Sequence, residues 1–440
     1  MANEAGGNKA VSDPRRGSKV AANSDVARRL TDICGPGYAR AAGPADDVAT
    51  AMPRWVAAPP TVAAVAEVLR LSAEHDLALV PRGSGSKMHW GATPSHVDIV
   101  LDTARLAGVW HHPPDAATAQ VGAGTPLRKA QAAVGRKGWR LPFDPPSAGA
   151  TVGGVVAADE AGPMSYGHGS PCRHLIGVNY VDASGTLVRT TPDTSDGREV
   201  SRLLCGSQGA LAVLVSATVR LQPEPADRLW VRRSVRTPLE VHDLVAESTV
   251  AGLRAAAIEL DLPGAEPPPR RGPLRPGLLA MLFEGDATQT RRRAQRAADL
   301  LGADASVTDQ PPTWWQRYPF AAGDIAIRLE VPVAHLHAAI YALVDAARAP
   351  IPVRGAVATG LVHAVLPGST PPHRVEEILV GVRTVLLARG GSCRVLSAPA
   401  AVRRVIDIWG DVPGLPRLRE LKQRFDPHHR LAPGRFTGGL

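Results

Sequence analysis

The sequence has few of the features that would mark a disulfide-stapled, metal-binding or membrane protein. Its 440 residues contain four widely separated cysteines (Cys34, Cys172, Cys205 and Cys393) and no C-x-x-C pair. We therefore expect neither a disulfide scaffold nor a cysteine-ligated zinc site, but reduced thiols in a cytoplasmic protein. The longest apolar run, near residues 210–219, is too short to span a bilayer. The N-terminus lacks the apolar segment of a signal peptide.

Acidic residues are also in deficit, which leaves a formal net charge of +9. A nucleic-acid-binding protein would gather this charge into a patch or a recognition motif. Here the basic residues are scattered, and aromatic residues make up only 4% of the chain. The charge therefore indicates small anionic ligands, and we expect no nucleic-acid partner.

The length exceeds what one hydrophobic core usually supports, so we expect two domains. The sequence predicts a disordered leader over residues 1–26 and an α/β region over residues 27–225. An α+β domain of strands backed by helices follows over residues 226–415, and residues 416–440 form a C-terminal segment that returns to the first domain. No segment is expected to cross a membrane.

Glycine and proline are abundant, and they gather in loops that follow predicted strands. Apolar residues from Val62 to Leu71 recur at helical spacing after Thr61, a typical N-cap residue. The next predicted strand, "LALVP", runs directly into "RGSGS" at residues 82–86. Such a loop is either a plain tight turn or a nest of backbone N–H groups that binds phosphate oxygens.

Two more loops of small residues lie in the same region, "PPSAGATVGG" at residues 145–154 and "GSQG" at residues 206–209. None of the three loops fits the P-loop, the G-x-G-x-x-G dinucleotide fingerprint or the kinase motifs. Three such loops in one domain favour a long ligand that the backbone approaches closely, as a dinucleotide requires. A glycine-rich set of turns without a ligand is the alternative.

These motifs resemble a known family of flavoproteins. "PPTVAAVAEVLRLSAEHDLALVPRGSGSKMHWG", "PFDPPSAGATVGGVVA", "GSQGALAVL" and the terminal "LKQRFDPHHRLAPGRF" are similar to segments of the vanillyl-alcohol oxidase/p-cresol methylhydroxylase superfamily. The chain looks most like the FAD-binding subunit of bacterial glycolate oxidase. The resemblance implies a two-lobed FAD-binding domain of the p-cresol methylhydroxylase type, followed by an α+β cap or substrate domain.

The resemblance also implies which residues bind non-covalent FAD. The first loop would hold the pyrophosphate, the second would form the facing wall and the third would seat the cofactor. These residues are Arg82, Gly83, Ser84, Gly85 and Ser86 in the first loop, Ser147, Gly149, Thr151, Gly153 and Gly154 in the second, and Gly206 and Gly209 in the third.

For catalysis the resemblance points to Arg328 as the anchor of a substrate carboxylate and to His363 as the base. The implied function is an FAD-linked oxidoreductase that dehydrogenates a 2-hydroxy acid such as glycolate or lactate. It would act alone or with a partner FAD subunit and an iron–sulfur subunit. Residues 193–199 depart from the family pattern near the cofactor. The alternative is therefore a catalytically decayed FAD-binding or scaffolding subunit of a glycolate-oxidase-like complex.

Overall fold

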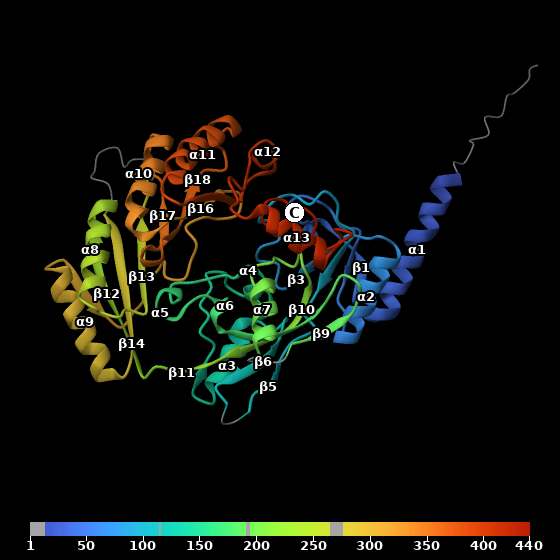
Figure 1. Cartoon of the computed structure of the whole chain (residues 1–440), viewed down its shortest axis with the longest axis horizontal. Coiled ribbons are helices and arrows are strands. Elements are labelled where there is room, and N and C mark those ends of the chain that lie inside the picture. The colour runs from blue at the N-terminus through green and yellow to red at the C-terminus, as the bar shows by residue number, and fades with distance from the viewer. Residues whose placement is uncertain (1–13, 114–115, 191–193, 265–275) are drawn as a thin grey trace, which may run out of the picture.

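The first and second halves of the chain form two lobes in the computed structural model (Figure 1). The structure describes residues 14–113, 116–190, 194–264 and 276–440. Of the leader expected over residues 1–26, residues 1–13 lie outside the described residues. Helix α1 (Pro14–Cys34) starts inside the expected leader. Its second half is held because Val26, Leu30 and Cys34, spaced four residues apart, are buried in the core.

A four-stranded sheet delivers the first glycine loop. Its strands, in spatial order, are β1 (Ala39–Ala41), β2 (Trp55–Ala57), β4 (Ile99–Asp102) and β3 (Leu79–Arg82). Strands β2 and β3 both run parallel to β4. Helix α2 (Val62–Glu74) connects β2 to β3, and the Thr61 side chain accepts a hydrogen bond from the Ala64 N–H. The predicted helix, its N-cap and the strand that follows it are therefore confirmed.

A second, antiparallel sheet completes the first lobe. Its spatial order is β5 (Val109–His111), β6 (Thr118–Gly122), β10 (Val213–Arg220), β8 (Leu175–Val181) and β9 (Leu187–Arg189). The other elements of this lobe are α3 (Leu127–Gly135), β7 (Trp139–Arg140), α4 (Val152–Ala158), α5 (Ser165–His168), α6 (Pro171–His174), α7 (Ser195–Leu204), β11 (Gln222–Pro223) and the short 3₁₀ helix Pro44–Asp46.

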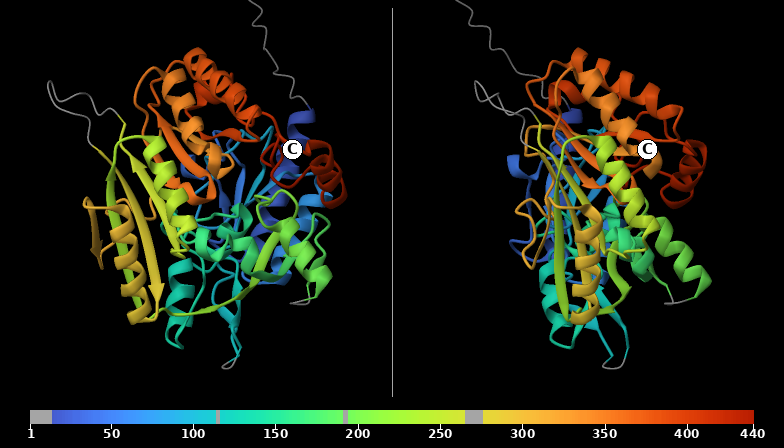
Figure 2. Two further views of the ribbon diagram at one scale, coloured as in Figure 1. Left: turned by 60° about the vertical axis from the view of Figure 1, so that its left-hand side comes forward. Right: turned by 90° about the vertical axis from the view of Figure 1, so that its left-hand side faces the viewer.

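The second lobe is built on an eight-stranded antiparallel sheet (Figure 2). Its spatial order is β15 (Ala305–Thr308), β12 (Asp227–Val235), β14 (Gly277–Gly285), β13 (Ala257–Leu262), β17 (Val353–Ala356), β18 (Leu361–Leu366), β16 (Ile325–Glu330) and β19 (Ser392–Ser397). The helices are α8 (Pro238–Val250), α9 (Ala287–Leu301), α10 (Leu336–Ala347), α11 (Pro372–Leu387) and α12 (Ala400–Arg403), with 3₁₀ helices at Val333–His335 and Val357–Thr359.

Alternation along the strands decides which side chains face the first lobe. In β16, Ile325, Ile327 and Leu329 join the core cluster under helices α8–α11. Because successive side chains of a strand point to opposite faces, Arg328 leaves the other face of the sheet. The helices cover the apolar face, so the face that carries Arg328 is the one available for a site between the lobes.

The C-terminal segment crosses back to the first lobe, where α13 (Leu415–Phe425) packs. Leu431 forms a parallel bridge with Leu79 of β3, and the Leu79 N–H donates to the Arg430 carbonyl at 2.8 Å. Lys422 is fully buried, and its ammonium group binds Asp426 and the Ala210 carbonyl, each at 2.8 Å. The chain end thus supports the strand that carries the glycine loop.

A buried ion pair ties the two lobes together. Arg140 of β7 in the first lobe binds Glu284 of β14 in the second through both carboxylate oxygens, and Nη1 lies 2.8 Å from Oε2. The His168 imidazole lies 2.7 Å from the same carboxylate. Burial by itself would raise the pKa of Glu284, but His168 and Arg140 hold it well below its ordinary value.

We expect Glu284→Gln to lower the free energy of unfolding by about 3 kcal/mol at pH 7, because it leaves the Arg140 cation buried without a counter-charge. The folded-state pKa of Glu284 is depressed, so its contribution is present above the ordinary value of 4.5 and is lost as the pH falls further. Urea titrations at several pH values should therefore show the deficit shrinking in acid. Arg28→Gln, which breaks an exposed pair with Asp25, should change stability by less than about 1 kcal/mol. An equal loss in both variants would contradict this account.

Candidate functional site

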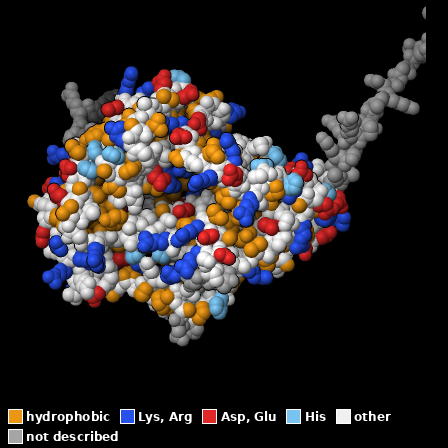
Figure 3. Space-filling view, viewed as in Figure 1, with side chains coloured by type: hydrophobic (Ala, Val, Ile, Leu, Met, Phe, Trp, Pro, Cys, Tyr) orange, Lys and Arg blue, Asp and Glu red, His pale blue; other side chains and the backbone are white. Residues whose placement is uncertain are grey.

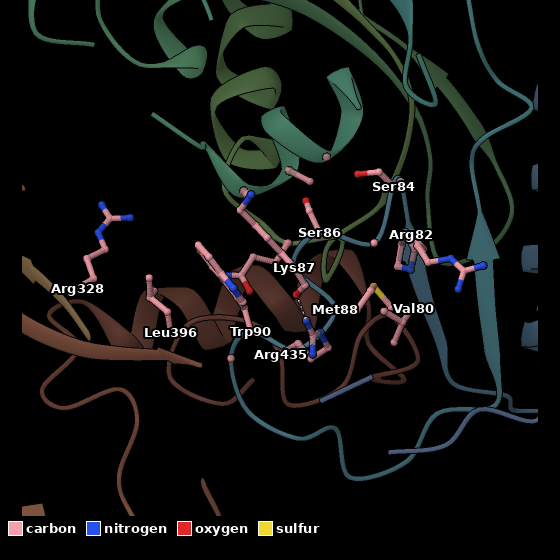
Figure 4. Close-up of a pocket in the computed structure, with 18 of the residues that line it drawn as sticks. Val80, Arg82, Ser84, Ser86, Lys87, Met88, Trp90, Arg328, Leu396 and Arg435 are labelled. Carbon is pink, nitrogen blue, oxygen red and sulfur yellow. Dashed lines mark hydrogen bonds between the residues drawn. The ribbon is translucent and has the colours of Figure 1, made fainter. Parts of the chain in front are cut away.

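A cavity of about 1040 Å³, counting the part open to solvent, lies between the glycine loop and the second lobe. Ligand sites commonly span about 300–1,000 Å³. Figure 4 shows Arg82 and Ser84 on one side of the cavity and Arg328 and Leu396 on the other. The described residues that line it are Val80, Pro81, Arg82, Gly83, Ser84, Gly85, Ser86, Lys87, Met88, Trp90, Gly91, Gly154, Ala157, Ala158, Gln208, Arg328, Arg394, Val395, Leu396, Trp409 and Arg435.

The first predicted loop forms one wall of the cavity, with Gly83, Ser84, Gly85 and Ser86 all in its lining. In the part of the chain that the structure describes, none of the backbone N–H groups of residues 83–87 donates a hydrogen bond. Gly85 has φ +82°, a conformation that glycine adopts without strain. Free N–H groups on consecutive residues are the feature that distinguishes an anion-binding nest from a plain turn.

Arg82 holds the base of this loop rather than presenting a free charge. Its guanidinium binds Asp46 and Asp102, each at 2.8 Å. Both carboxylates are fixed by the first lobe, so the positive charge of Arg82 is neutralised within the protein. Arg82 therefore serves to position the loop.

The second predicted loop meets the first at Gly83. A Cβ atom on Gly83 would lie 2.2 Å from the Oγ1 atom of Thr151. The same Oγ1 accepts a hydrogen bond from the Gly154 N–H and caps helix α4. Gly154 lines the cavity, whereas Gly153 packs against Ala123, to whose carbonyl it donates at 2.8 Å. The glycines at 83 and 153 thus allow close contact between backbone segments.

Four of the five predicted residues of the second loop lie outside the cavity lining: Ser147, Gly149, Thr151 and Gly153. Ser147 and Gly149 border a neighbouring groove instead. Ser147 still contacts the site indirectly, because its Oγ atom accepts a hydrogen bond from the Lys87 ammonium group at 2.7 Å.

The third predicted loop closes the cavity near the end of α4. The Gly206 N–H donates to the Val156 carbonyl at 3.0 Å, and a Cβ on Gly209 would lie 2.9 Å from Pro81. Gln208 between them lines the cavity. The three loops that the sequence singled out therefore converge in space, although Gly206 and Gly209 position the turn and Gln208 is the residue at the cavity.

Lys87 is neutralised in the same way as Arg82. Its ammonium group binds the buried carboxylate of Glu160 and lies 5.0 Å from the centre of the Trp90 ring. The Tyr318 hydroxyl from the second lobe donates to Glu160 at 2.9 Å. Burial lowers the pKa of Lys87, and Glu160 opposes that shift.

Arg435 is a site residue that the sequence reasoning missed. It is 5% exposed and lines the cavity. Its Nη2 atom donates to the Lys87 carbonyl at 3.2 Å, whereas Nη1 has no partner among the described residues. Burial, and then the nearby Arg403, lower the pKa of Arg435 to about 10. The terminal "LAPGRF" motif was a signal for this segment, but its contact with the loop is visible only in the fold.

The two predicted catalytic residues lie on adjacent strands, since Arg328 of β16 is directly opposite His363 of β18. Arg328 lines the large cavity, whereas His363 lines a smaller one beside Tyr318 and Glu259. Burial, and then the Arg328 charge, lower the pKa of His363 to about 3. Its ring packs edge-on against Tyr318 at 4.9 Å.

The cavity lining fits an anionic dinucleotide. Free N–H groups on residues 83–87 and the unpartnered Nη1 of Arg435 are donors suited to phosphate oxygens. No Asp, Glu or His is among the described residues that line the cavity. Figure 3 shows the hollow between the two lobes, with Lys and Arg side chains around it.

Residues 53–191 match the family model described as an FAD binding domain. The chain carries an FAD-binding domain. The resemblance to FAD-binding proteins inferred from the sequence is therefore confirmed over these residues, as is the expectation that FAD is the cofactor.

Among curated proteins, the chain is 31% identical over 166 residues to a D-lactate dehydrogenase of Archaeoglobus fulgidus, covering 37% of each protein. It is 32% identical over 162 residues to glycolate oxidase subunit GlcE of Escherichia coli, covering 36% of this chain and 46% of GlcE. Glycolate oxidase subunit GlcD of Bacillus subtilis is 29% identical over 213 residues, covering 47% of this chain and 44% of GlcD. These matches span less than half of each relative's length.

The fold extends beyond the matched segment. A solved alkyldihydroxyacetonephosphate synthase superposes with a TM-score of 0.70 at 14% identity, covering 93% of this chain and 85% of that one. At this identity the likeness shows the fold alone, and it confirms the predicted α+β class across both lobes. None of the helices that the structure describes is both long and apolar enough to cross a membrane.

We expect Gly83→Ala to weaken FAD binding and lower the melting temperature, because the new methyl group would displace Thr151 and break the cap of α4. Loss of such a cap costs about 1 kcal/mol before any movement of the loop is counted. Gly135→Ala is the matched control, since its Cβ would meet nothing within 4 Å. Thermal unfolding with and without FAD measures both effects. A Gly83→Ala protein as stable as Gly135→Ala would refute the close contact.

Proposed function

We propose that the protein is an FAD-dependent oxidoreductase that dehydrogenates a 2-hydroxy acid such as glycolate or lactate, with FAD bound non-covalently. The observation that carries the proposal is the cavity itself, with unpaired N–H groups at one end and Arg328 at the other. One end suits a pyrophosphate and the other a carboxylate. The relatives named D-lactate dehydrogenase and glycolate oxidase subunits support this class of substrate.

In this proposal the protein holds and orients both ligands. Residues 83–86, Gly154 and Arg435 bind the pyrophosphate, while Arg82 positions the first loop and Ser147, Gly149, Thr151, Gly153, Gly206 and Gly209 shape the surrounding loops. Arg328 anchors the substrate carboxylate. Bound FAD would supply the acceptor for the hydride that leaves C2 of the acid.

His363 is the proposed acceptor of the substrate hydroxyl proton because it lies directly opposite Arg328. A carboxylate bound at Arg328 would offset the positive charge that lowers the pKa of His363, so substrate binding would make the imidazole more basic. Tyr318, against which the ring packs, has its pKa raised by burial and the nearby Glu160 charge, and it stays protonated.

A catalytically decayed FAD-binding subunit is the second candidate. It is favoured by the lack of Asp, Glu and His in the described cavity lining, and by the low pKa of His363. Either candidate would act in the cytoplasm, beside a partner FAD subunit and an iron–sulfur subunit. The relatives named as glycolate oxidase subunits support the partner subunits. The four free thiols support the cytoplasm.

We expect the purified protein to be yellow, to release FAD on acid denaturation, and to lose its flavin absorbance when glycolate or D-lactate is added without oxygen. Anaerobic absorbance spectra measure the reduction. A protein that binds FAD but keeps it oxidised with a panel of 2-hydroxy acids would favour the decayed subunit. A colourless protein that binds no added FAD would refute both candidates.

Arg435→Gln should weaken FAD binding by about tenfold or more, because a charged hydrogen bond to phosphate is lost. Quenching of FAD fluorescence on titration with apoprotein gives the dissociation constant. Arg404→Gln removes the same charge from a residue outside the cavity lining and should leave the affinity unchanged. Equal affinities for wild type and Arg435→Gln would remove Arg435 from the proposed cofactor site.

A further inference from the structure

The second-lobe end of the cavity carries two arginines that face each other across a strand pair. Arg328 of β16 and Arg394 of β19 are directly opposite in register. Side chains at such positions leave the same face of the sheet, and both line the cavity. Like charges placed directly opposite each other destabilise a strand pair. The arrangement therefore calls for a counter-charge.

The protein supplies that counter-charge only in part. Arg328 Nη2 binds Glu330 Oε2 at 2.9 Å, but the Glu330 side chain is 48% exposed, and Arg328 Nε has no partner within the described residues. The guanidinium of Arg394 forms no hydrogen bond or ion pair with any residue that the structure describes. Burial, and then the charge of Arg328, lower the pKa of Arg394.

The neighbouring positions of the same row carry no excess charge. His363 and then Arg354 continue the row across β18 and β17. Arg354 binds Asp261 at 2.7 Å, and His363 is neutral because its pKa is about 3. At the other end of the row, Arg328 and Arg394 lie near the one carboxylate of Glu330. This group of three side chains therefore carries one net positive charge.

We propose that Arg328 and Arg394 form a clamp that binds one carboxylate of a 2-hydroxy monocarboxylate between their guanidinium groups. This inference rests on the proposed function and deepens it. Arg394 becomes a second carboxylate-binding residue, and the single net charge makes a monoanion the matched ligand. Two planar guanidinium groups can each donate a pair of N–H groups to a carboxylate, which fixes the orientation of the bound acid.

The test uses 2-hydroxy-2-methylpropanoate, which has no hydrogen on C2 and cannot be oxidised. Calorimetric titration of the FAD-loaded protein should show binding that weakens by roughly 10- to 100-fold in both Arg394→Gln and Arg328→Gln, the range for a lost charged hydrogen bond. Arg394→Lys keeps the charge without the planar fork and should bind with intermediate affinity. Arg291→Gln, which removes an exposed charge from α9, should bind like wild type.

Three outcomes would overturn the clamp. These are unchanged binding in Arg394→Gln, an equal loss in Arg291→Gln, and binding of the dianion 2-hydroxy-2-methylbutanedioate more than about tenfold tighter than the monoanion. If Arg394→Gln does not fold, Arg394→Lys gives the same comparison with the charge retained.

The readouts also separate the clamp from the proposed function. Analogue binding that depends on Arg394, in a protein whose flavin is not reduced by any 2-hydroxy acid, would support the clamp and refute turnover. Normal flavin reduction at unchanged KM in Arg394→Gln would support turnover and refute the clamp. An increase in KM with little change in kcat is the result expected of a carboxylate-binding residue.

Discussion

The close approach of Gly83 to Thr151 is the constraint on which the cofactor site depends. A side chain at position 83 would occupy the space of the Thr151 hydroxyl, so only glycine lets the loop after β3 lie against the cap of α4. With the loop in that position, the Lys87 carbonyl meets Arg435 and the 206–209 turn packs on Pro81. Segments more than 300 residues apart in the chain therefore share one contact region.

The second lobe contributes side chains to the cavity, and the alternation of residues along its strands determines which ones. Alternation along β16 and β19 sends the apolar side chains into the core under the helices and Arg328 and Arg394 to the opposite face. The ion pair of Arg140 with Glu284 ties this sheet to the first lobe. The site is thus assembled from a backbone loop on one lobe and a row of side chains on the other.

Much of this arrangement could be predicted from local sequence. The helix after Thr61, the strand that ends at Arg82 and the three small-residue loops are set by neighbouring residues, through capping, periodicity and glycine. Arg394 and Arg435 could not be found in the same way. Their places at the cavity depend on strand register and on the return of the C-terminal segment, which are contacts between distant parts of the chain.

Contacts between distant parts of the chain also explain why several glycines pack against other segments instead of contacting the cavity, as their motif suggests. Gly153, Gly206 and Gly209 make the loops fit together, and the neighbouring Gly154 and Gln208 reach the cavity. A motif identifies the segment that approaches a ligand, because close backbone packing and close ligand approach both require a missing side chain. It does not say which residue of the segment makes the contact.

The basic side chains around the cavity are of two kinds: those paired with a carboxylate of the protein and those without such a partner among the described residues. Arg82 and Lys87 are neutralised by Asp46, Asp102 and Glu160, so they hold the structure together. Arg394 and Arg435 have no carboxylate partner among the described residues, and burial lowers the pKa of each. An arginine kept partly out of water without a counter-ion destabilises the protein unless a ligand supplies the missing charge. Anions that bind there stabilise the folded state, and the stabilisation grows with the logarithm of the ratio of ligand concentration to dissociation constant. The two uncompensated arginines are therefore the groups proposed to bind the anionic cofactor and the anionic substrate.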